Sequence, residues 1–353
     1  PTTATNTKDF LNKNGHDVLT WSFDEHTRMP VPLSDHSSTH TIAPNDDGDI
    51  VVSIYLIGGC LSQHRSHSIY ESNSPTLMVR LRANILPCPD VSPHVLVYDA
   101  TFDKFSEAKD LPHPRLRHTS TSVNGQIWVI GGRSDGDDLV AEVEVYDAGL
   151  DRWYEVGMVP RKFLTSDAAA FSHGKYLYVV GGYDVNYVAT EFTIRLDTEE
   201  IFQNPVLNGG NIPYHQMSDM KIGRGSHSVV SYSHFAFVVG GYTHNDNYCA
   251  SLKNTDRLNI FEDTWEEASN LNIPLANTNM VKFNSQFFTI GGEVTNMVVM
   301  DQSPGKTCMD VVPSNTIEIL DPSMDFEAKW KMVERRPDND YIGIKNTAVP
   351  WLA

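Results

Sequence analysis

The sequence lacks any long uninterrupted apolar run, and it is poor in basic residues and in cysteine. No window approaches the roughly 18 apolar residues that a helix needs to cross a bilayer, although 40% of the 353 residues are hydrophobic. Lys and Arg total 27 against 45 Asp and Glu, which gives a net charge of −18. This charge repels phosphate backbones and anionic membranes. The composition therefore predicts a soluble protein with no nucleic-acid partner and no membrane span.

Linear catalytic motifs are also missing. The sequence contains no nucleophile elbow, no phosphate-binding loop and no zinc-protease helix. His64 and His67, near Cys60, are ligand types that suit zinc or copper, but no paired ligand motif accompanies them, and we interpret them as part of a solvated polar loop. We therefore assign no catalytic residue, no metal site and no cofactor from the sequence.

The stretch 117–153 has the pattern of a four-stranded unit. An alternating first strand ends at Asn124-Gly125, which can take the positive φ angles of a tight hairpin turn. The run 126–130 is apolar and β-branched, as in a buried strand, and Gly131-Gly132 ends it. A third strand is expected at 142–146, and a fourth closes the unit.

The same pattern recurs along the chain. An apolar run ends in a double glycine five times, with the second glycine at Gly59, Gly132, Gly182, Gly241 and Gly292. These glycines are 50 to 73 residues apart. The order of apolar strand, Gly-Gly, Tyr-Asp and Trp resembles the kelch repeat, which forms one blade of a β-propeller.

The resemblance implies an all-β fold, a kelch-type β-propeller with six four-stranded blades. Residues 18–24 are expected to form a third strand and 345–351 a first strand, so the N- and C-terminal strands would share the sixth blade and close the ring. All of 1–353 would then be a single propeller domain. Residues 1–17 are expected to be an N-terminal extension, with loop insertions at 60–93 and 293–313 and an irregular insertion at 198–221.

The fourth strand of each blade should carry an aromatic residue. Trp153, Trp265 and Trp330 have this position in three blades, and Phe202 is expected to have it in another. We expect these rings to pack between blades.

The four cysteines leave two alternatives open, free thiols or disulfides. Cys60 and Cys88 bracket one long loop, and Cys249 and Cys308 lie in equivalent loops of blades that should be neighbours, so Cys60–Cys88 and Cys249–Cys308 are the possible pairs. Four cysteines are few for this length, and the chain has no Asn-x-Ser/Thr sequon. These two observations favour a cytoplasmic or organellar location over secretion.

Ligands of kelch proteins bind on the face where the second strand ends, around the central channel, and the resemblance implies the same here. Counting back 14 residues from the first glycine of each pair gives the expected channel-lining positions, and residues after the glycines and in the insertions complete the rim. The predicted ligand- or partner-binding residues are Arg65, Arg117, Arg133, Asp167, Tyr183, Arg224, Ser226, Tyr242, Asn277 and Glu293.

Some of the polar residues on this face have an equally good structural interpretation. Arg115 and Arg161 follow prolines in a link that commonly carries arginine in kelch repeats, where it can hydrogen-bond the neighbouring blade. His118 and His227 follow the channel-lining position directly, and His40 is a third candidate. A residue that recurs with the repeat is interpreted as structural rather than catalytic.

The sequence predicts a soluble kelch-propeller binding or scaffold protein. Its partner would be a protein, engaged through the loop face around the channel mouth, and the chain could be a subunit of a larger assembly. The alternative is an enzyme of the kelch-propeller type, epimerase- or lyase-like, acting on an acidic carbohydrate. Arg117, Glu293, His64, Tyr183 and Tyr242 would then be the first catalytic candidates.

Overall fold

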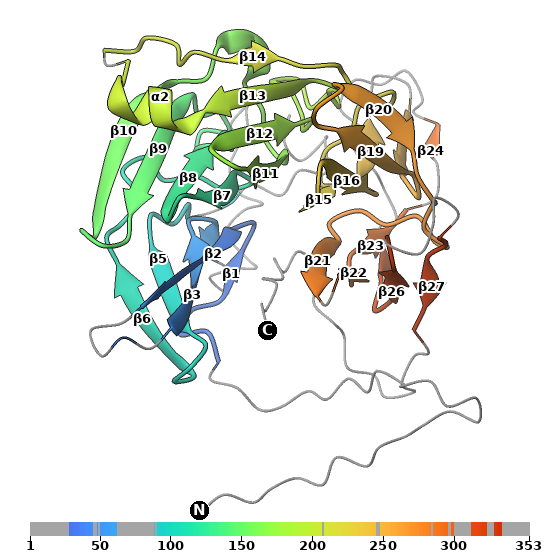
Figure 1. The fold of residues 1–353 in the computed structure, drawn as a ribbon, viewed down its shortest axis with the longest axis horizontal. Helices are drawn as coiled ribbons and strands as arrows, with labels where there is room; N and C mark the ends of the chain where they lie inside the picture. Colours follow the sequence, from blue (N-terminus) through green and yellow to red (C-terminus); the bar gives the residue numbers. More distant parts are fainter. Residues whose placement is uncertain are drawn as a thin grey trace, which may run out of the picture.

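The computed structural model describes residues 28–44, 48, 50–61, 88, 90–206, 208–244, 248–283, 285–295, 298–299, 312–322 and 328–333. These residues form five four-stranded antiparallel sheets, each built from strands that follow one another around the ring (Figure 1). Among them, no helix has both the length and the apolar character needed to cross a membrane.

Each sheet is one blade, and its strands run outward from the centre in sequence order. Blade one contains β2 (Ser37–Pro44), β3 (Ile50–Ile57), β5 (Val95–Asp99) and β6 (Lys104–Ala108). Blade two contains β7 (Thr119–Val123), β8 (Gln126–Ile130), β9 (Glu142–Asp147) and β10 (Arg152–Met158). Blade three contains β11 (Ala169–His173), β12 (Tyr176–Val180), β13 (Thr193–Asp197) and β14 (His215–Gln216). Blade four contains β15 (Ser228–Tyr232), β16 (Phe235–Val239), β19 (Thr255–Asn259) and β20 (Thr264–Glu267). Blade five contains β21 (Asn279–Phe283), β22 (Gln286–Ile290), β26 (Ile317–Leu320) and β27 (Lys331–Met332).

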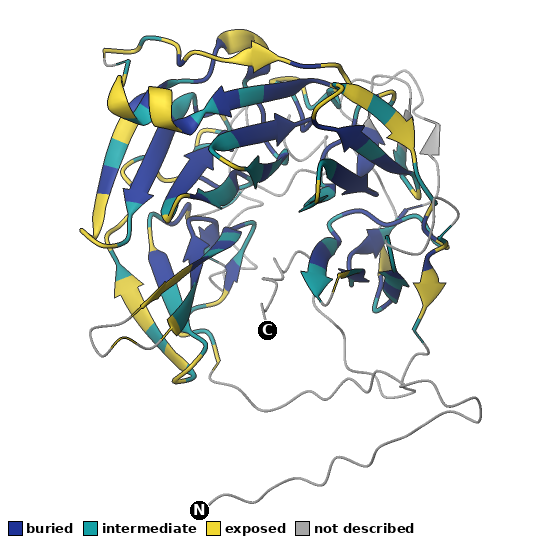
Figure 2. Ribbon diagram, viewed as in Figure 1, coloured by how far each residue is buried: buried dark blue, intermediate teal, exposed yellow. Residues whose placement is uncertain are grey.

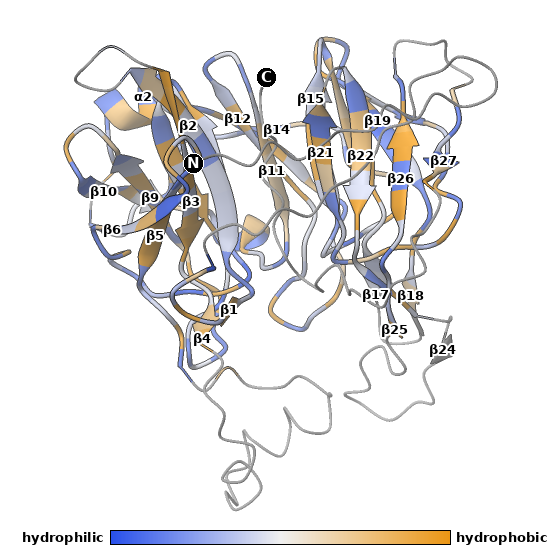
Figure 3. Ribbon diagram, turned by 90° about the horizontal axis from the view of Figure 1, so that it is seen from below, coloured by the Kyte–Doolittle hydropathy of each residue, from blue (hydrophilic) through white to orange (hydrophobic). Residues whose placement is uncertain are grey.

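Short strands extend one end of the blades. The pair β1 (Leu33–Ser34) and β4 (Cys60–Leu61) belongs to blade one, and β23 (Glu293–Val294) pairs with β25 (Val312–Pro313) in blade five. The loops of blades four and five share a sheet made of β17 (Tyr242–His244), β18 (Tyr248–Ser251) and β24 (Val298–Val299). Figure 3 shows these short strands at one end of the sheets, so the loops after the second strand of each blade share one face.

The core lies between blades. Apolar side chains of the middle strands of one sheet face those of the next, and the four larger clusters each join two consecutive blades. Figure 2 shows the middle strands as mostly buried and the outer strands as mostly exposed. Because burying one Val, Leu or Phe side chain contributes roughly 1.5–3 kcal/mol, these layers are what hold the ring together.

The tryptophans confirm the predicted packing between blades. The indole N–H of Trp153 donates to the carbonyl of Lys109 at 2.8 Å, and that of Trp265 donates to the carbonyl of Ser218 at 2.9 Å. In both cases the acceptor precedes the blade that carries the indole, so each ring anchors its own outer strand to the chain arriving from the previous blade.

The double glycines are in close contact with the start of their own blade and of the next blade. A Cβ on Gly182 would lie 2.5 Å from the carbonyl oxygen of Ser166, at the start of the same blade, and one on Gly131 would lie 2.5 Å from that of Thr165, at the start of the next blade. Both glycines have positive φ angles, +97° and +69°. The backbone N–H of Gly182 donates to the carbonyl of Arg224 in the next blade at 2.8 Å. Only glycine satisfies this combination of backbone angle and contact.

Two predictions need comment. Phe202 was expected in the fourth strand of blade three, and this is wrong: it lies in α2 (Thr198–Gln203), where its ring contacts Tyr154 of β10 edge-on at 5.5 Å between centroids. The segment predicted to be irregular therefore begins with a helix, which Asp197 caps by accepting from the N–H of Glu200. The strands predicted at 18–24 and 345–351 lie outside the described residues, so the sixth blade stays a prediction.

Candidate functional site

Five residues at the starts of the blades form a ring of left-handed backbone around the channel. Asp35, Arg117, Asp167, Ser226 and Asn277 have φ angles between +48° and +56°. The N–H of each of the last four donates to the carbonyl oxygen of the residue before it in this series, at 2.7–2.8 Å. Main-chain hydrogen bonds thus link consecutive blades, and we call these five residues the mouth ring.

The mouth ring surrounds a small cavity. Its volume is about 120 Å³, and its lining includes all five ring residues and the residue after each one. The Arg117 Nε donates to the Asp35 carboxylate at 3.3 Å, and the Ser226 hydroxyl donates to the Asp167 carboxylate at 3.4 Å. Neighbouring blades are therefore also connected through side chains at the mouth.

The charge of Arg117 is stabilised by two carboxylates. Burial alone would lower the pKa of its guanidinium, but Asp167 and Asp35 raise that pKa above the usual value. The side chain is 18% exposed, so part of the group reaches solvent at the mouth. The result is a fixed cation between two anions, with donors that can bind an incoming carboxylate.

A second layer of predicted residues lies beneath the mouth ring. Tyr183 and Tyr242 are 8% and 7% exposed and pack together with Ala276. Burial raises the pKa of both hydroxyls; the Asp167 charge adds to the effect at Tyr183, and the Glu293 charge adds to it at Tyr242. Both phenols therefore stay protonated at neutral pH.

Glu293 connects this second layer to the mouth ring. Its carboxylate accepts a hydrogen bond from the side-chain amide of Asn277, and its backbone pairs with Ala276. Seven of the ten predicted binding residues thus belong to one connected group at the mouth: Arg117, Asp167, Tyr183, Ser226, Tyr242, Asn277 and Glu293.

Arg224 lies elsewhere, inside blade four. Its guanidinium donates to the carbonyls of Gly240 and Asn254 and forms an ion pair with Asp256, and its side chain is fully buried. Arg115 has the matching position in blade two, where it binds Gly131, Glu142 and the buried Glu144 at 2.7 Å. Both arginines are therefore structural, but the carbonyl and carboxylate partners named here belong to the blade that each arginine enters and not to the neighbouring blade.

Arg133 is also buried, at the junction of blades two and three. Its guanidinium donates to the Ser166 hydroxyl at 3.0 Å and to the Asp184 carbonyl at 2.7 Å. The ring of Tyr187 covers it, with 3.7 Å between the guanidinium carbon and the ring centroid. The donors of this arginine are thus directed at the protein itself.

The histidines that follow the mouth ring are His36, His118 and His227. Burial lowers the pKa of His36 to about 4 and that of His227 to about 3, and burial followed by the Arg115 charge lowers that of His118. His118 Nε2 lies 2.7 Å from the Ser37 hydroxyl of the previous blade. The prediction that His40 shares this position is wrong, because His40 lies within β2 opposite Ile54.

Asp35 is the functional position that sequence reasoning missed. The 14-residue count fails in blade one because β2 and β3 have eight residues each where the first hairpins of the other described blades have five. A usable signal was present, since Asp35-His36 repeats the pattern of Arg117-His118 and Ser226-His227.

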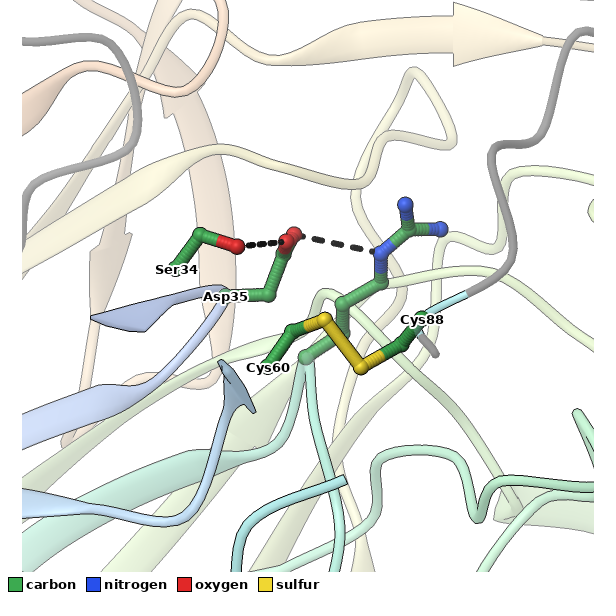
Figure 4. Close-up of a disulfide and its surroundings, with 5 residues drawn as sticks. Ser34, Asp35, Cys60 and Cys88 are labelled. Carbon is green, nitrogen blue, oxygen red and sulfur yellow. Dashed lines mark hydrogen bonds and ion pairs between the residues drawn. A yellow bond between two sulfur atoms is a disulfide. The ribbon is translucent and has the colours of Figure 1, made fainter. Parts of the chain in front are cut away.

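A disulfide joins Cys60 and Cys88 close to the mouth ring. Figure 4 shows it beside Ser34 and Asp35, and β1 and β4 pair Ser34 with Cys60. Cys308, Arg65, His64 and His67 lie outside the described residues, as does the side chain of Cys249, so the Cys249–Cys308 pairing and a role for Arg65 stay predictions. Within the described ranges, no group of three or more His, Cys, Asp or Glu side chains is placed to hold a metal ion.

Comparisons with known proteins agree with the architecture. Residues 114–157 match the family profile of the Kelch motif. Beta-scruin of Limulus polyphemus is 26% identical over 245 residues, which cover 68% of this chain and 24% of that protein. A kelch repeat-containing protein of Arabidopsis thaliana is 24% identical over 302 residues, which cover 82% of this chain and 63% of that protein.

The chain thus spans less than two thirds of the length of either relative. Among solved structures, that of YjhT superposes with a TM-score of 0.60 at 13% sequence identity and covers 92% of this chain and 90% of that one, a likeness that concerns the fold alone. The repeat pattern, the five described sheets and these matches together show a β-propeller fold whose repeats are similar to the Kelch motif.

Proposed function

We propose that this chain binds a protein partner through the propeller face that carries the mouth ring. The observation that supports this most directly is the mouth ring itself, where five blades present four kinds of polar side chain on a backbone joined by hydrogen bonds. Loops held by a rigid scaffold lose little conformational entropy when they bind, which favours affinity.

The size of the mouth cavity favours a protein partner over a small molecule. Sites that enclose a small ligand have volumes of roughly 300–1,000 Å³, whereas the mouth cavity has about 120 Å³. A cavity of this size fits the end of one side chain. Arg117, partly exposed and fixed by its carboxylate neighbours, is the best candidate to bind a carboxylate on that side chain.

Co-purification tests the proposal. Tagged wild-type protein, Arg117→Ala and Lys104→Ala would be compared by quantitative mass spectrometry of the proteins bound from the source tissue. Lys104 is a suitable control because it is an exposed cation on the outer strand β6. We expect a partner at fixed stoichiometry with wild type and Lys104→Ala, and a reduced amount with Arg117→Ala. Equal recovery with all three proteins would reject the mouth as the binding site.

A second candidate function, catalysis on an acidic carbohydrate, is supported by the charged groups at the mouth. The charges of Arg117, Asp167 and Glu293 all act on the Tyr183 phenol at the mouth. A guanidinium can bind the carboxylate of an anionic sugar, and a protonated phenol near it can serve as a proton donor. Ligand-observed NMR with hexuronates tests it: line broadening with wild type that is lost in Arg117→Ala would support the carbohydrate function.

A further inference from the structure

A groove between blades one and two is lined by carboxylates, so its charge is opposite to that of Arg117 at the mouth. Its volume is about 500 Å³, four times that of the mouth cavity, and within the range of ligand sites. We call it the acidic groove. It is lined by Asp90, Val91, His113, Pro114, Ser134, Asp135, Asp138, Leu139, Val140 and Glu142.

The groove combines carboxylates with an apolar surface. Asp90, Asp135, Asp138 and Glu142 come from both blades, and none of them has an ion-pair partner among the described residues. None of the ten lining residues, all of them described, is a lysine or an arginine. Unpaired carboxylates around a hollow form an attractive site for a cation.

The apolar part of the lining is supplied mainly by Val91, Leu139 and Val140. Val91 and Val140 are buried and so form fixed walls. Arginine and lysine carry a charged group on a long apolar stem, and such stems pack on apolar surface while the head binds an anion. The groove therefore fits a basic side chain better than it fits a hydrated inorganic cation.

Arg115 and Arg133, which adjoin lining residues in sequence, are directed into the protein. The guanidinium of Arg115 binds the fully buried Glu144, and the Glu142 charge also raises its pKa. The guanidinium of Arg133 donates to the carbonyls of Asp137 and Asp184 and to the hydroxyl of Ser166. Within the part of the chain that the structure describes, neither guanidinium forms an ion pair with a carboxylate of the groove.

Both sides of the groove are held in place before any ligand binds. On one side the Cys60–Cys88 disulfide lies two residues before Asp90, whose carbonyl accepts from Leu61 N–H, and Cys60 pairs with Val91. On the other side, the N–H of Ser134 donates to the carbonyl of Asp138 at 2.9 Å, and the N–H of Asp137 donates to the carbonyl of Ser134 at 3.0 Å. A site fixed in this way loses little entropy on binding.

We propose that the acidic groove binds an arginine-bearing segment of another protein. Arginine is favoured over lysine because its planar guanidinium binds carboxylates in a bidentate manner. Charge complementarity supports this occupant, since the segment would be basic and the chain carries −18. The groove is separate from the mouth cavity, so this proposal does not depend on the partner proposed there.

The test uses a fluorescein-labelled tetra-arginine peptide and the full chain, with binding followed by fluorescence anisotropy at about 0.1 M salt, where charges interact over roughly 10 Å. The groove variant is Asp135→Asn with Asp138→Asn. The matched control is Glu107→Gln with Glu155→Gln, which removes the same charge from exposed positions on β6 and β10. A tetra-glutamate peptide is the negative probe.

We expect saturable binding of tetra-arginine, weakened about tenfold in the groove variant, which corresponds to about 1.4 kcal/mol, and changed less than twofold in the control. Equal weakening in the groove variant and the control would show attraction to overall charge and reject the site, as would non-saturable binding or loss of binding with EDTA.

Carbodiimide labelling gives a readout that does not depend on the variants. Saturating tetra-arginine should protect Asp90, Asp135, Asp138 and Glu142 from modification and leave Glu107 and Glu155 equally reactive. Uniform labelling of all six with the peptide bound would overturn the proposal.

Discussion

The backbone N–H of Asp167 donates to the carbonyl oxygen of Arg117 at 2.7 Å, and this bond joins blade three to blade two at the channel mouth. It involves no side-chain atom, so any residue that has a backbone N–H and tolerates a positive φ can keep it. The side chains of the mouth can therefore serve binding while the main chain holds the blades together. The predictions below test this division and the buried contacts that support it.

Substitution of a double glycine should strongly destabilise the fold. In Gly182→Ala the new Cβ would lie 2.0 Å from the Thr165 hydroxyl oxygen, at a φ of +97°. We expect a loss of about 3 kcal/mol or more in the free energy of unfolding, measured in urea. Gly174→Ala is the matched control, because Gly174 has a φ of +59° and no atom within 4 Å of a new Cβ; its loss should be about 1 kcal/mol. Equal losses of unfolding free energy in the two variants would mean that the close contact between Gly182 and Thr165 plays no part.

The buried ion pair of blade two should be far more important than an exposed one. Glu144→Gln leaves the guanidinium of Arg115 buried without its counter-ion, and we expect a loss of about 3–5 kcal/mol in unfolding free energy. Glu266→Gln breaks the more exposed Arg257–Glu266 pair and should change stability by less than about 1 kcal/mol. A loss of that small size for Glu144→Gln would contradict the role assigned to Arg115.

The protein should lose stability on acidification. The folded pKa values of His36 and His227 are about 4 and about 3, below the ordinary 6.5, so the unfolded chain binds protons that the folded chain does not. Above pH 6.5 these histidines do not change the free energy of unfolding. Below pH 6.5, each of them lowers the free energy of unfolding by about 1.4 kcal/mol per pH unit until its folded pKa is reached.

His227→Thr tests this, since Thr278 has the equivalent position in blade five. The dependence of unfolding free energy on pH between 6 and 4 should become shallower by about 1.4 kcal/mol per pH unit. An unchanged slope would show that His227 takes up its proton in the folded state.

Reduction of the Cys60–Cys88 disulfide should weaken both stability and the acidic groove. The bond closes a loop with a sequence separation of 28, for which the chain-entropy model gives about 3–4 kcal/mol. Cys60→Ser with Cys88→Ser should lose stability in that range and bind tetra-arginine less tightly, because Asp90 loses its anchor. Unaltered binding would show that the disulfide serves stability alone.

Much of the fold could be predicted from the sequence because the blade pattern is local. The alternation of apolar residues, the Asn124-Gly125 turn and the double glycines each define a strand end within a few residues. The mouth-ring positions were predicted by counting back 14 residues from the first glycine of each pair. The count failed in blade one, where the longer hairpin places Asp35 further from the glycines. Hairpin length depends on side-chain pairing across two strands, which a fixed count does not capture.

The direction of side chains could not be predicted in the same way. Tyr183 and Tyr242 follow a double glycine and looked exposed, yet they lie under the mouth ring, where Gly225 leaves room for the Tyr183 ring. Arg133 has the same position and points between blades. The direction of such a side chain depends on its contacts with the neighbouring blade, which is 50 to 60 residues away in sequence. The acidic groove also depends on how two blades pack, so it could not be predicted from local patterns.

The mouth ring also has an evolutionary consequence. Asp35, Arg117, Asp167, Ser226 and Asn277 represent four residue types of different charge or size, yet all five adopt a similar left-handed φ and four of them donate the same main-chain bond. The main-chain bonds can then survive substitution at each position, provided that the new residue has a backbone N–H and tolerates a positive φ. Gene duplication and point mutation would thus let one scaffold explore new specificities combinatorially, one blade at a time.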